Sequence, residues 1–287
     1  MSILIDGLSL GSIYALIALG YTMVYGIAKM LNFAHGDIIM VGAYAVMTTI
    51  ALFANPIVSV VCAVVLCTVL GIVIEKVAYK PLRGASPLAV LITAIGVSYL
   101  LQSIAQLAFG AKTQPVTLVS LGAITIGSLT ISLSSIVTLA VGAVIMIGLT
   151  VFIKTTRVGR AMIAVSEDRG AAELMGINVN FIISLTFAIG SALAAAAGVF
   201  YLLQIPSVSP TLGSMPGIKA FTAAVIGGIG SIPGAMIGGI LLGVIEKLCQ
   251  SVPALSPYTT AIEFGLLILI LLVKPTGLLG RKRREKV

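Results

Sequence analysis

The chain has 287 residues, of which 59% are hydrophobic and 9% are charged, and its net charge is +8. Soluble domains carry roughly 25% charged residues, so this composition excludes a soluble globular protein. The mean hydropathy is +1.19, and several apolar runs approach the roughly 20 residues that cross a bilayer. Long alternating segments, typical of membrane barrels, are absent from the sequence. The chain is therefore predicted to be a single transmembrane domain, residues 1–287, of an all-α polytopic membrane protein.

The first predicted span, residues 1–27, has no basic leading segment and contains Asp6, so it is expected to be an uncleaved helix rather than a signal peptide. Between the fourth and fifth spans, β-branched alternation over residues 123–131 predicts a small hairpin. The later predicted spans cover approximately residues 36–55, 57–78, 88–109, 133–153, 181–203 and 257–273.

Residues 219–248 are rich in glycine around Pro233, so one continuous helix is not expected there. Broken or re-entrant helices occur at membrane depth where they are buried in protein or line a water-filled path, and their free ends often serve substrate pathways. Close helix packing through small residues is the alternative. Gly228, Gly230 and Pro233 are accordingly pathway candidates, and Glu246 and Lys247 are candidates for an ion pair. The total is about eight transmembrane helices, within a range of seven to nine.

A second group of pathway candidates, Asn32, His35 and Asp37, lies at the edge of an apolar run. Ionisable residues at membrane depth are candidates for function. Two other interpretations stay open: His35 is a packed or interfacial residue, and Asp37 caps a helix that starts near Gly36. No metal site or cofactor is predicted, because His35 is the only histidine and the carboxylates are scattered.

The positive charge fits membrane topology better than nucleic-acid binding, because most basic residues lie in alternate gaps between spans. The positive-inside rule places those gaps in the cytoplasm, together with a basic tail over residues 274–287. The N-terminus is then external and the C-terminus cytoplasmic. The basic residues concerned are Lys29, Lys76, Lys80, Arg83, Lys154, Arg157, Arg160, Arg169, Lys274, Arg281, Lys282, Arg283, Arg284 and Lys286.

The longest polar interruption of the chain is RVGRAMIAVSEDRGAAELMGINVN, residues 157–180. Small and apolar residues recur in it at three- and four-residue steps, which predicts two short amphipathic helices. A turn is expected near residues 166–170, and Gly176 is expected to end the second helix. An ordinary solvated loop is the alternative. The chain has no phosphate-binding GxxxxGK[ST] loop and no GxSxG or HExxH motif, so an enzyme is not predicted.

Four separated motifs resemble the LivH-type permeases of ABC importers for branched-chain amino acids. They are NFAHGDIIMVGAYAV at 32–46, AVSEDRGAAELMGINVN at 164–180, KAFTAAVIGGIGSIPGAMIGG at 219–239 and KPTGLLG at 274–280. The resemblance implies a bacterial inner-membrane permease that forms the pathway for branched-chain amino acids. The implied partners are a second, similar permease, two ATP-hydrolysing subunits and an extracytoplasmic substrate-binding protein.

The resemblance also identifies residues 154–180 as a cytoplasmic coupling loop of the EAA type, whose helices seat in a groove of each ATPase. It makes Ala171, Ala172 and Gly176 the packed centre of the loop. Its rim is Arg157, Arg160, Glu167 and Arg169.

Three alternatives remain at this point: an ion-coupled secondary transporter of small polar solutes, an ABC permease for urea, amides or other amino acids, and a structural membrane scaffold. Glu263 departs from the family pattern, where a small or apolar residue is usual. It is expected to be either a pathway carboxylate or a residue that faces the partner permease.

Overall fold

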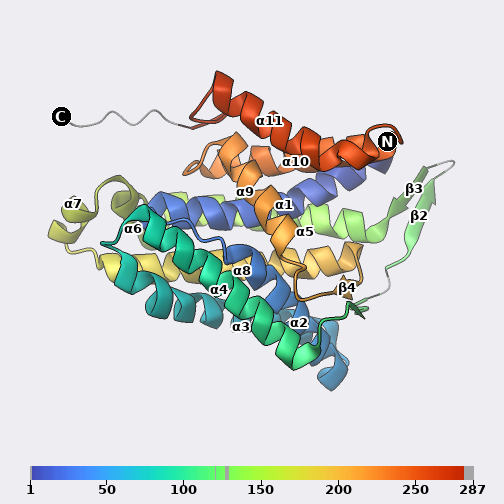
Figure 1. Cartoon of the computed structure of the whole chain (residues 1–287), viewed down its shortest axis with the longest axis horizontal. Helices are drawn as coiled ribbons and strands as arrows, with labels where there is room; N and C mark the ends of the chain where they lie inside the picture. Colours follow the sequence, from blue (N-terminus) through green and yellow to red (C-terminus); the bar gives the residue numbers. More distant parts are fainter. Residues whose placement is uncertain (1, 120, 127–128, 281–287) are drawn as a thin grey trace.

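A computed structural model describes residues 2–119, 121–126 and 129–280 of the chain. Residues 281–287, the second half of the predicted basic tail, lie outside the described part. The helices are α1 (Ser2–Ala28), α2 (His35–Phe53), α3 (Pro56–Ile74), α4 (Pro87–Phe109), α5 (Leu133–Thr155), α6 (Arg157–Glu167), α7 (Arg169–Leu174), α8 (Val179–Gln204), α9 (Ser214–Gly227), α10 (Ile232–Ser251) and α11 (Thr259–Val273). Long helices run roughly along one common axis; α6, α7 and the strands lie toward the ends of this bundle, and the short helix α9 crosses its middle (Figure 1).

Among the described residues, eight helices are long and apolar enough to cross a membrane: α1, α2, α3, α4, α5, α8, α10 and α11. This confirms the prediction of an all-α polytopic membrane protein. Helix α3 continues through a π-helical turn, Glu75–Tyr79, and a 3-10 turn, Lys80–Leu82. A further 3-10 turn, Ser256–Tyr258, precedes α11. Helix α9 has only 14 residues, about 21 Å of helix, and is too short to span the hydrocarbon layer alone.

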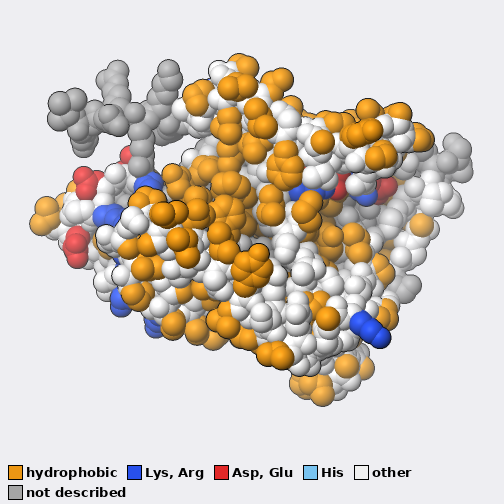
Figure 2. Space-filling model, viewed as in Figure 1, with side chains coloured by type: hydrophobic (Ala, Val, Ile, Leu, Met, Phe, Trp, Pro, Cys, Tyr) orange, Lys and Arg blue, Asp and Glu red, His pale blue; other side chains and the backbone are white. Residues whose placement is uncertain are grey.

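The two ends of the bundle differ. Helix α7 and the last residues of α11 lie at one end, called here the α7 end, whereas α1 begins at the other (Figure 1). That second end carries the strands β2 (Ala123–Ile126) and β3 (Leu129–Ser132), which form the predicted antiparallel hairpin. Strands β1 (Gln114–Pro115) and β4 (Ser207–Val208) pair across 92 residues. Figure 2 shows hydrophobic side chains over much of the visible face, with one group of charged side chains at the α7 end and others toward the opposite end.

Small residues bring α1 and α10 together at the centre of the bundle. A Cβ atom at Gly239 would lie 2.4 Å from the Cα atom of Ala15, and one at Gly243 would lie 2.3 Å from the Cα atom of Gly11. Such separations are below van der Waals contact, so only glycine allows this approach. Without a hydrophobic force between helices in lipid, close backbone packing supplies the stability. The predicted alternative, close helix packing through small residues, is therefore confirmed for α10.

The glycine-rich region is a helical hairpin, not one helix. A Cβ atom at Gly234 would meet Gly227, and one at Gly238 would meet Ala223. This order of contacts shows that α9 and α10 run antiparallel. Residues 228–231 turn the chain, with positive φ angles of 108° at Gly228 and 93° at Gly230. The expected break near 219–248 is thus this turn.

Candidate functional site

The first turn of α2 lies beside the middle of α1 rather than beside its end. After Ala28, residues 29–34 turn back along the helix, and the His35 imidazole reaches Gly20, where a Cβ atom would lie 2.2 Å from Nε2. The Tyr21 and His35 rings meet edge to face with centroids 4.8 Å apart. A polar start of a helix is therefore held at membrane depth, where polar groups are usually functional.

Asp37 is buried in this first turn but does not cap the helix. Helix α2 starts at His35, and its N-terminus has no side-chain cap, so the capping hydrogen bond is absent. Asp37 does lie in the first turn, so its negative charge is at the positive end of the helix dipole, as that interpretation expected. The Asp37 Oδ1 atom instead accepts a hydrogen bond from Gln102 Nε2 of α4 at 2.9 Å. The same amide group lies 3.3 Å from the hydroxyl oxygens of Ser98 and Ser214. One polar cluster thus joins α2, α4 and α9.

A cavity of about 340 Å³ adjoins this cluster. Its polar wall contains Asp37, Gln102, Ser98 and Ser214, and the rest of the lining is largely apolar or aromatic. Its lining residues come mainly from α2, α4 and α9; α4 and α9 face the viewer in Figure 1. The remaining lining residues are Tyr21, Phe33, Gly36, Leu91, Ile95, Tyr99, Gly213, Gly217 and Ile218.

The starts of α2 and α9 meet at the edge of the cavity. A Cβ atom at Gly36 would lie 2.6 Å from the Gly213 carbonyl oxygen and 3.1 Å from the Gly217 Cα atom, so the backbones are almost in contact. The two helices leave this point along different paths. Because a helix N-terminus carries a partial positive charge, both dipoles favour a negative group here.

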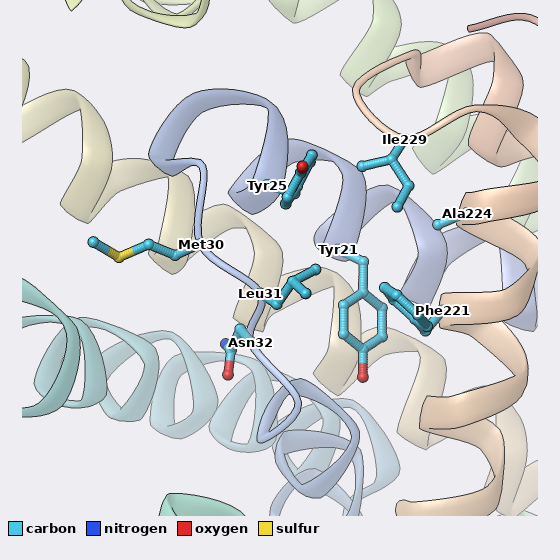
Figure 3. A pocket seen from close by; sticks show the side chains of 8 residues that line it. All are labelled: Tyr21, Tyr25, Met30, Leu31, Asn32, Phe221, Ala224 and Ile229. Carbon is cyan, nitrogen blue, oxygen red and sulfur yellow. The ribbon is translucent and has the colours of Figure 1, made fainter. Parts of the chain in front are cut away.

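Asn32 and His35 lie near the cavity but do not line it. Asn32 is buried, and its Oδ1 atom accepts a hydrogen bond from Tyr79 Oη at 2.8 Å. It borders a second cavity of only about 10 Å³ on the side toward the α7 end. Figure 3 shows Tyr21 beside Phe221 at this small space, with ring centroids 5.8 Å apart. Tyr21 lines both cavities, so its ring separates them.

The other predicted pathway residues lie elsewhere. Gly228 and Gly230 form the α9–α10 turn, and Pro233 lies in the first turn of α10. None of the three lines the 340 Å³ cavity. A Cβ atom at Gly228 would lie 2.5 Å from the Gly280 backbone nitrogen, which shows that this glycine packs against the segment after α11.

The polar interruption forms the two short helices that the periodicity predicts. Thr156 caps α6, its hydroxyl accepting from the Gly159 N–H at 2.9 Å, and Asp168 caps α7, accepting from the Ala171 N–H at 3.0 Å. The turn between them is a single residue, Asp168, shorter than the expected 166–170. On α6, Met162 and Val165 are buried, whereas Arg157 and Arg160 are exposed. The helices thus present a charged face away from the bundle.

The packed centre expected for α7 is only partly present. Ala172 is buried, but Ala171 and Gly176 are exposed, and a Cβ atom at Gly176 would meet nothing within 4 Å. Gly176 ends the helix, as predicted, because its φ of +81° favours glycine. Within residues 154–180 the most exposed large apolar side chains are those of Leu174 and Met175, which are 91% and 83% exposed. These two side chains are the free apolar tip of the α7 end.

Arg169 points into the protein instead of forming an outer rim with Glu167, which is exposed. Its guanidinium donates hydrogen bonds to the carbonyl oxygens of Ile27, at 3.1 Å, and of Ala28. These are last-turn carbonyls of α1 that no helical N–H satisfies. Burial, and then the positive charge of Arg83, lower the pKa of Arg169. Arg169 therefore ties α7 to the end of α1 and so to the segment that leads to α2.

Comparison with known proteins identifies the chain. Residues 3–272 match the family model described as the permease component of branched-chain amino acid transport systems. The chain belongs to this family.

Its relatives cover nearly its whole length. The high-affinity branched-chain amino acid transport system permease protein BraD of Pseudomonas aeruginosa is 46% identical over 99% of this chain and 97% of its own. The corresponding protein LivH of Escherichia coli is 44% identical over 98% and 96%. Among solved structures, PsaBC from Streptococcus pneumoniae in complex with Fab shares the fold, with a TM-score of 0.51 at 15% identity, over 96% of this chain and 93% of that one.

A second buried charged cluster of the permease lies between α9, α10 and α11. The ammonium group of Lys219 is 2.7 Å from Glu246 Oε1 and 3.2 Å from Glu263 Oε2. Glu246 also accepts hydrogen bonds from Tyr14 at 2.7 Å and from Gln250 at 3.1 Å. The expected pair of Glu246 with Lys247 is therefore wrong. Glu263 is fully buried against Lys219, so it does not face a partner from the surface of this chain. It lines neither of the two cavities described above, and its role in the pathway stays a prediction.

Sequence reasoning did not find Gln102, Ser214 and Tyr21 at the cavity. The Gln102 amide contacts Asp37 Oδ1, 65 residues away in the sequence, and Ser214 Oγ, 112 residues away. No local sequence pattern signals such contacts. Leu174 and Met175 had a usable signal, because they are large apolar residues at the end of a charged stretch.

Proposed function

We propose that this chain is the permease subunit of an ATP-driven importer for branched-chain amino acids. The observation that carries the proposal is the nearly full-length similarity to permeases of such systems, at 46% and 44% identity. The importer comprises this chain, a second similar permease, two ATP-hydrolysing subunits and an extracytoplasmic binding protein. The α7 end faces the cytoplasm, which gives an external N-terminus and a cytoplasmic C-terminus and agrees with the clustered basic residues.

Residues 154–180 are the contact for the ATPase. Leu174 and Met175 at the tip of α7 seat in its groove, and Arg157, Arg160 and Glu167 border them. Arg169 transmits the movement, because it joins α7 to the carbonyl groups that end α1. Residues 29–34 then connect α1 to the buried start of α2 at the large cavity. Rigid-body shifts of packed helices couple distant sites in this manner.

The test is co-purification of the ATPase with the tagged permease, followed by leucine uptake in proteoliposomes. Leu174→Asp is expected to reduce ATPase recovery about tenfold or more, because burying a leucine side chain is worth roughly 1.5–3 kcal/mol. Val119→Asp is the matched control: Val119 is also exposed, but it precedes the hairpin at the other end. Gly176→Asp is expected to reduce uptake about tenfold without affecting membrane insertion, since a side chain at positive φ strains the turn that ends α7 by about 1–2 kcal/mol.

Recovery of a homo-oligomer without an ATPase, with uptake driven by an ion gradient, would contradict the proposal. Normal ATPase recovery with Leu174→Asp would contradict only the assignment of the α7 tip. The two results separate the importer class from the docking residue.

A further inference from the structure

We propose that the 340 Å³ cavity is a transient binding site for an α-amino acid with an apolar side chain, in which Asp37 binds the ammonium group of the substrate. This inference rests on the proposed import of amino acids and names the chemistry of the site that the substrate occupies within the membrane. Three properties of the cavity carry it: a buried carboxylate without an ion-pair partner, two helix ends, of which that of α2 already bears Asp37, and an apolar wall.

The first property is a buried carboxylate with no cation. Asp37 is 2% exposed, and its hydrogen-bond donor is the neutral Gln102 amide. Within residues 2–119, 121–126 and 129–280, no lysine, arginine or histidine forms an ion pair with it. A buried charge is costly unless it is paired. The cavity beside Asp37 leaves room for a cationic group, and an amino acid supplies one.

The second property is the junction of α2 and α9. Their first turns meet at Gly36 and Gly213, and both turns border the cavity. The positive ends of two helix dipoles lie there, close to the carboxylate of Asp37. A ligand that carries both charges a few ångströms apart satisfies both features, and the zwitterionic head of an α-amino acid is such a ligand.

The third property is the remaining wall. Leu91 and Ile95 of α4 and Ile218 of α9 give the cavity an apolar side, and Phe33 and Tyr99 add aromatic surface. Its volume falls at the lower end of the roughly 300–1,000 Å³ typical of small-molecule sites. A branched aliphatic side chain loses contact with water against this wall. The cavity thus has one part for the charged head and one for an apolar side chain.

An aromatic cluster also lies between this site and the α7 end. Tyr21, Phe33 and Phe221 cluster at the base of the cavity, with Phe33 and Phe221 centroids 5.3 Å apart. On the other side of Tyr21 lies a much smaller space of about 10 Å³. The aromatic cluster therefore narrows the chain's interior between the cavity and the α7 end.

The first experiment uses the whole importer in proteoliposomes and records leucine uptake and ATP hydrolysis in parallel. Asp37→Asn keeps the size and a hydrogen-bonding oxygen but removes the charge, so uptake per ATP hydrolysed is expected to fall about tenfold or more. Stimulation of ATP hydrolysis by the loaded binding protein should persist. Asp37→Glu should retain more uptake than Asp37→Asn. Asp6→Asn is the matched control, because Asp6 also lies in a predicted span but bonds to Ser135.

Wild-type uptake per ATP with Asp37→Asn would overturn the proposal. Failure of the proposed function has a different signature, since the wild-type complex would then show no ATP-driven uptake at all.

The second experiment needs no change at Asp37. Ile218→Cys, in a chain with Cys62, Cys67 and Cys249 replaced, is treated with a cationic or an anionic methanethiosulfonate. The rate of each reagent with the introduced cysteine is divided by its rate with a free thiol. This ratio should be about tenfold higher for the cationic reagent than for the anionic one, owing to the nearby carboxylate. Leucine should slow the reaction, and sodium at the same concentration should not. Equal rates for the two reagents, or protection by sodium and not by leucine, would overturn the proposal.

Discussion

Two buried acidic sites of this permease differ in whether the protein supplies a cation for the carboxylates. Glu246 and Glu263 share the ammonium group of Lys219, so that cluster contains its own cation. Asp37 has amide and hydroxyl neighbours and borders a cavity of about 340 Å³. Removing a charge from water is costly in both places. In the first site the protein provides the compensating charge, and in the second, in our proposal, the substrate does.

This difference separates a structural site from a functional one. Lys219 comes from α9, Glu246 from α10 and Glu263 from α11, so the ionic cluster holds three helices together. Helix α11 has otherwise little buried surface, and the cluster fixes its position. The Asp37 site is also formed by three helices, but its centre is open. Variants that remove one charge at a time should therefore affect stability at the first site and transport at the second.

The largest expected effect on stability is that of Lys219→Met. This variant leaves two buried carboxylates without a cation, and breaking a buried ion pair in this way costs about 3–5 kcal/mol. The measurement is the free energy of unfolding of the purified permease in mild detergent. Lys112→Met, which changes an exposed lysine, should cost less than about 0.5 kcal/mol. Equal stability of the two variants would contradict the structural role of the cluster.

A smaller effect distinguishes the two glutamates. Glu246→Gln weakens the 2.7 Å contact with Lys219 and the bond from Tyr14, so it should cost about 1.5–3 kcal/mol. Glu263→Gln leaves one carboxylate for one ammonium group and relieves repulsion between the glutamates. Its cost should be below about 1 kcal/mol, as for replacements that keep a buried group paired. The same unfolding measurement ranks them, and the reverse order would show that Glu263 is the principal partner.

Much of the architecture follows from composition and periodicity. Apolar runs of spanning length predict the long helices, and the three- and four-residue steps after Arg157 predict α6 and α7, because a helix repeats every 3.6 residues. The break in the glycine-rich region was also predictable, since glycines around Pro233 disfavour a single helix. These features depend on neighbours along the chain, which the sequence displays directly.

The candidate site was only partly predictable, because it depends on contacts between distant segments. Asp37 was identified as a polar residue at membrane depth, but its partner Gln102 lies 65 residues away. Glu246 is adjacent to Lys247 in sequence, which suggested a pair, yet neighbouring residues on a helix point about 100° apart. The true partner, Lys219, reaches Glu246 only because α9 folds back along α10. Side-chain direction across a helical hairpin is tertiary information.

Asp37→Asn should also change stability only slightly, and it is the sharpest test of the comparison. The asparagine oxygen can still accept the hydrogen bond from Gln102, and the buried negative charge disappears. The free energy of unfolding should therefore change by less than about 1 kcal/mol, while uptake per ATP falls. Lys219→Met is the opposite control, with a large loss of stability. A loss of several kcal/mol with Asp37→Asn would place Asp37 in the same structural class as the Lys219 cluster, because its charge would then have a stabilising partner within the protein.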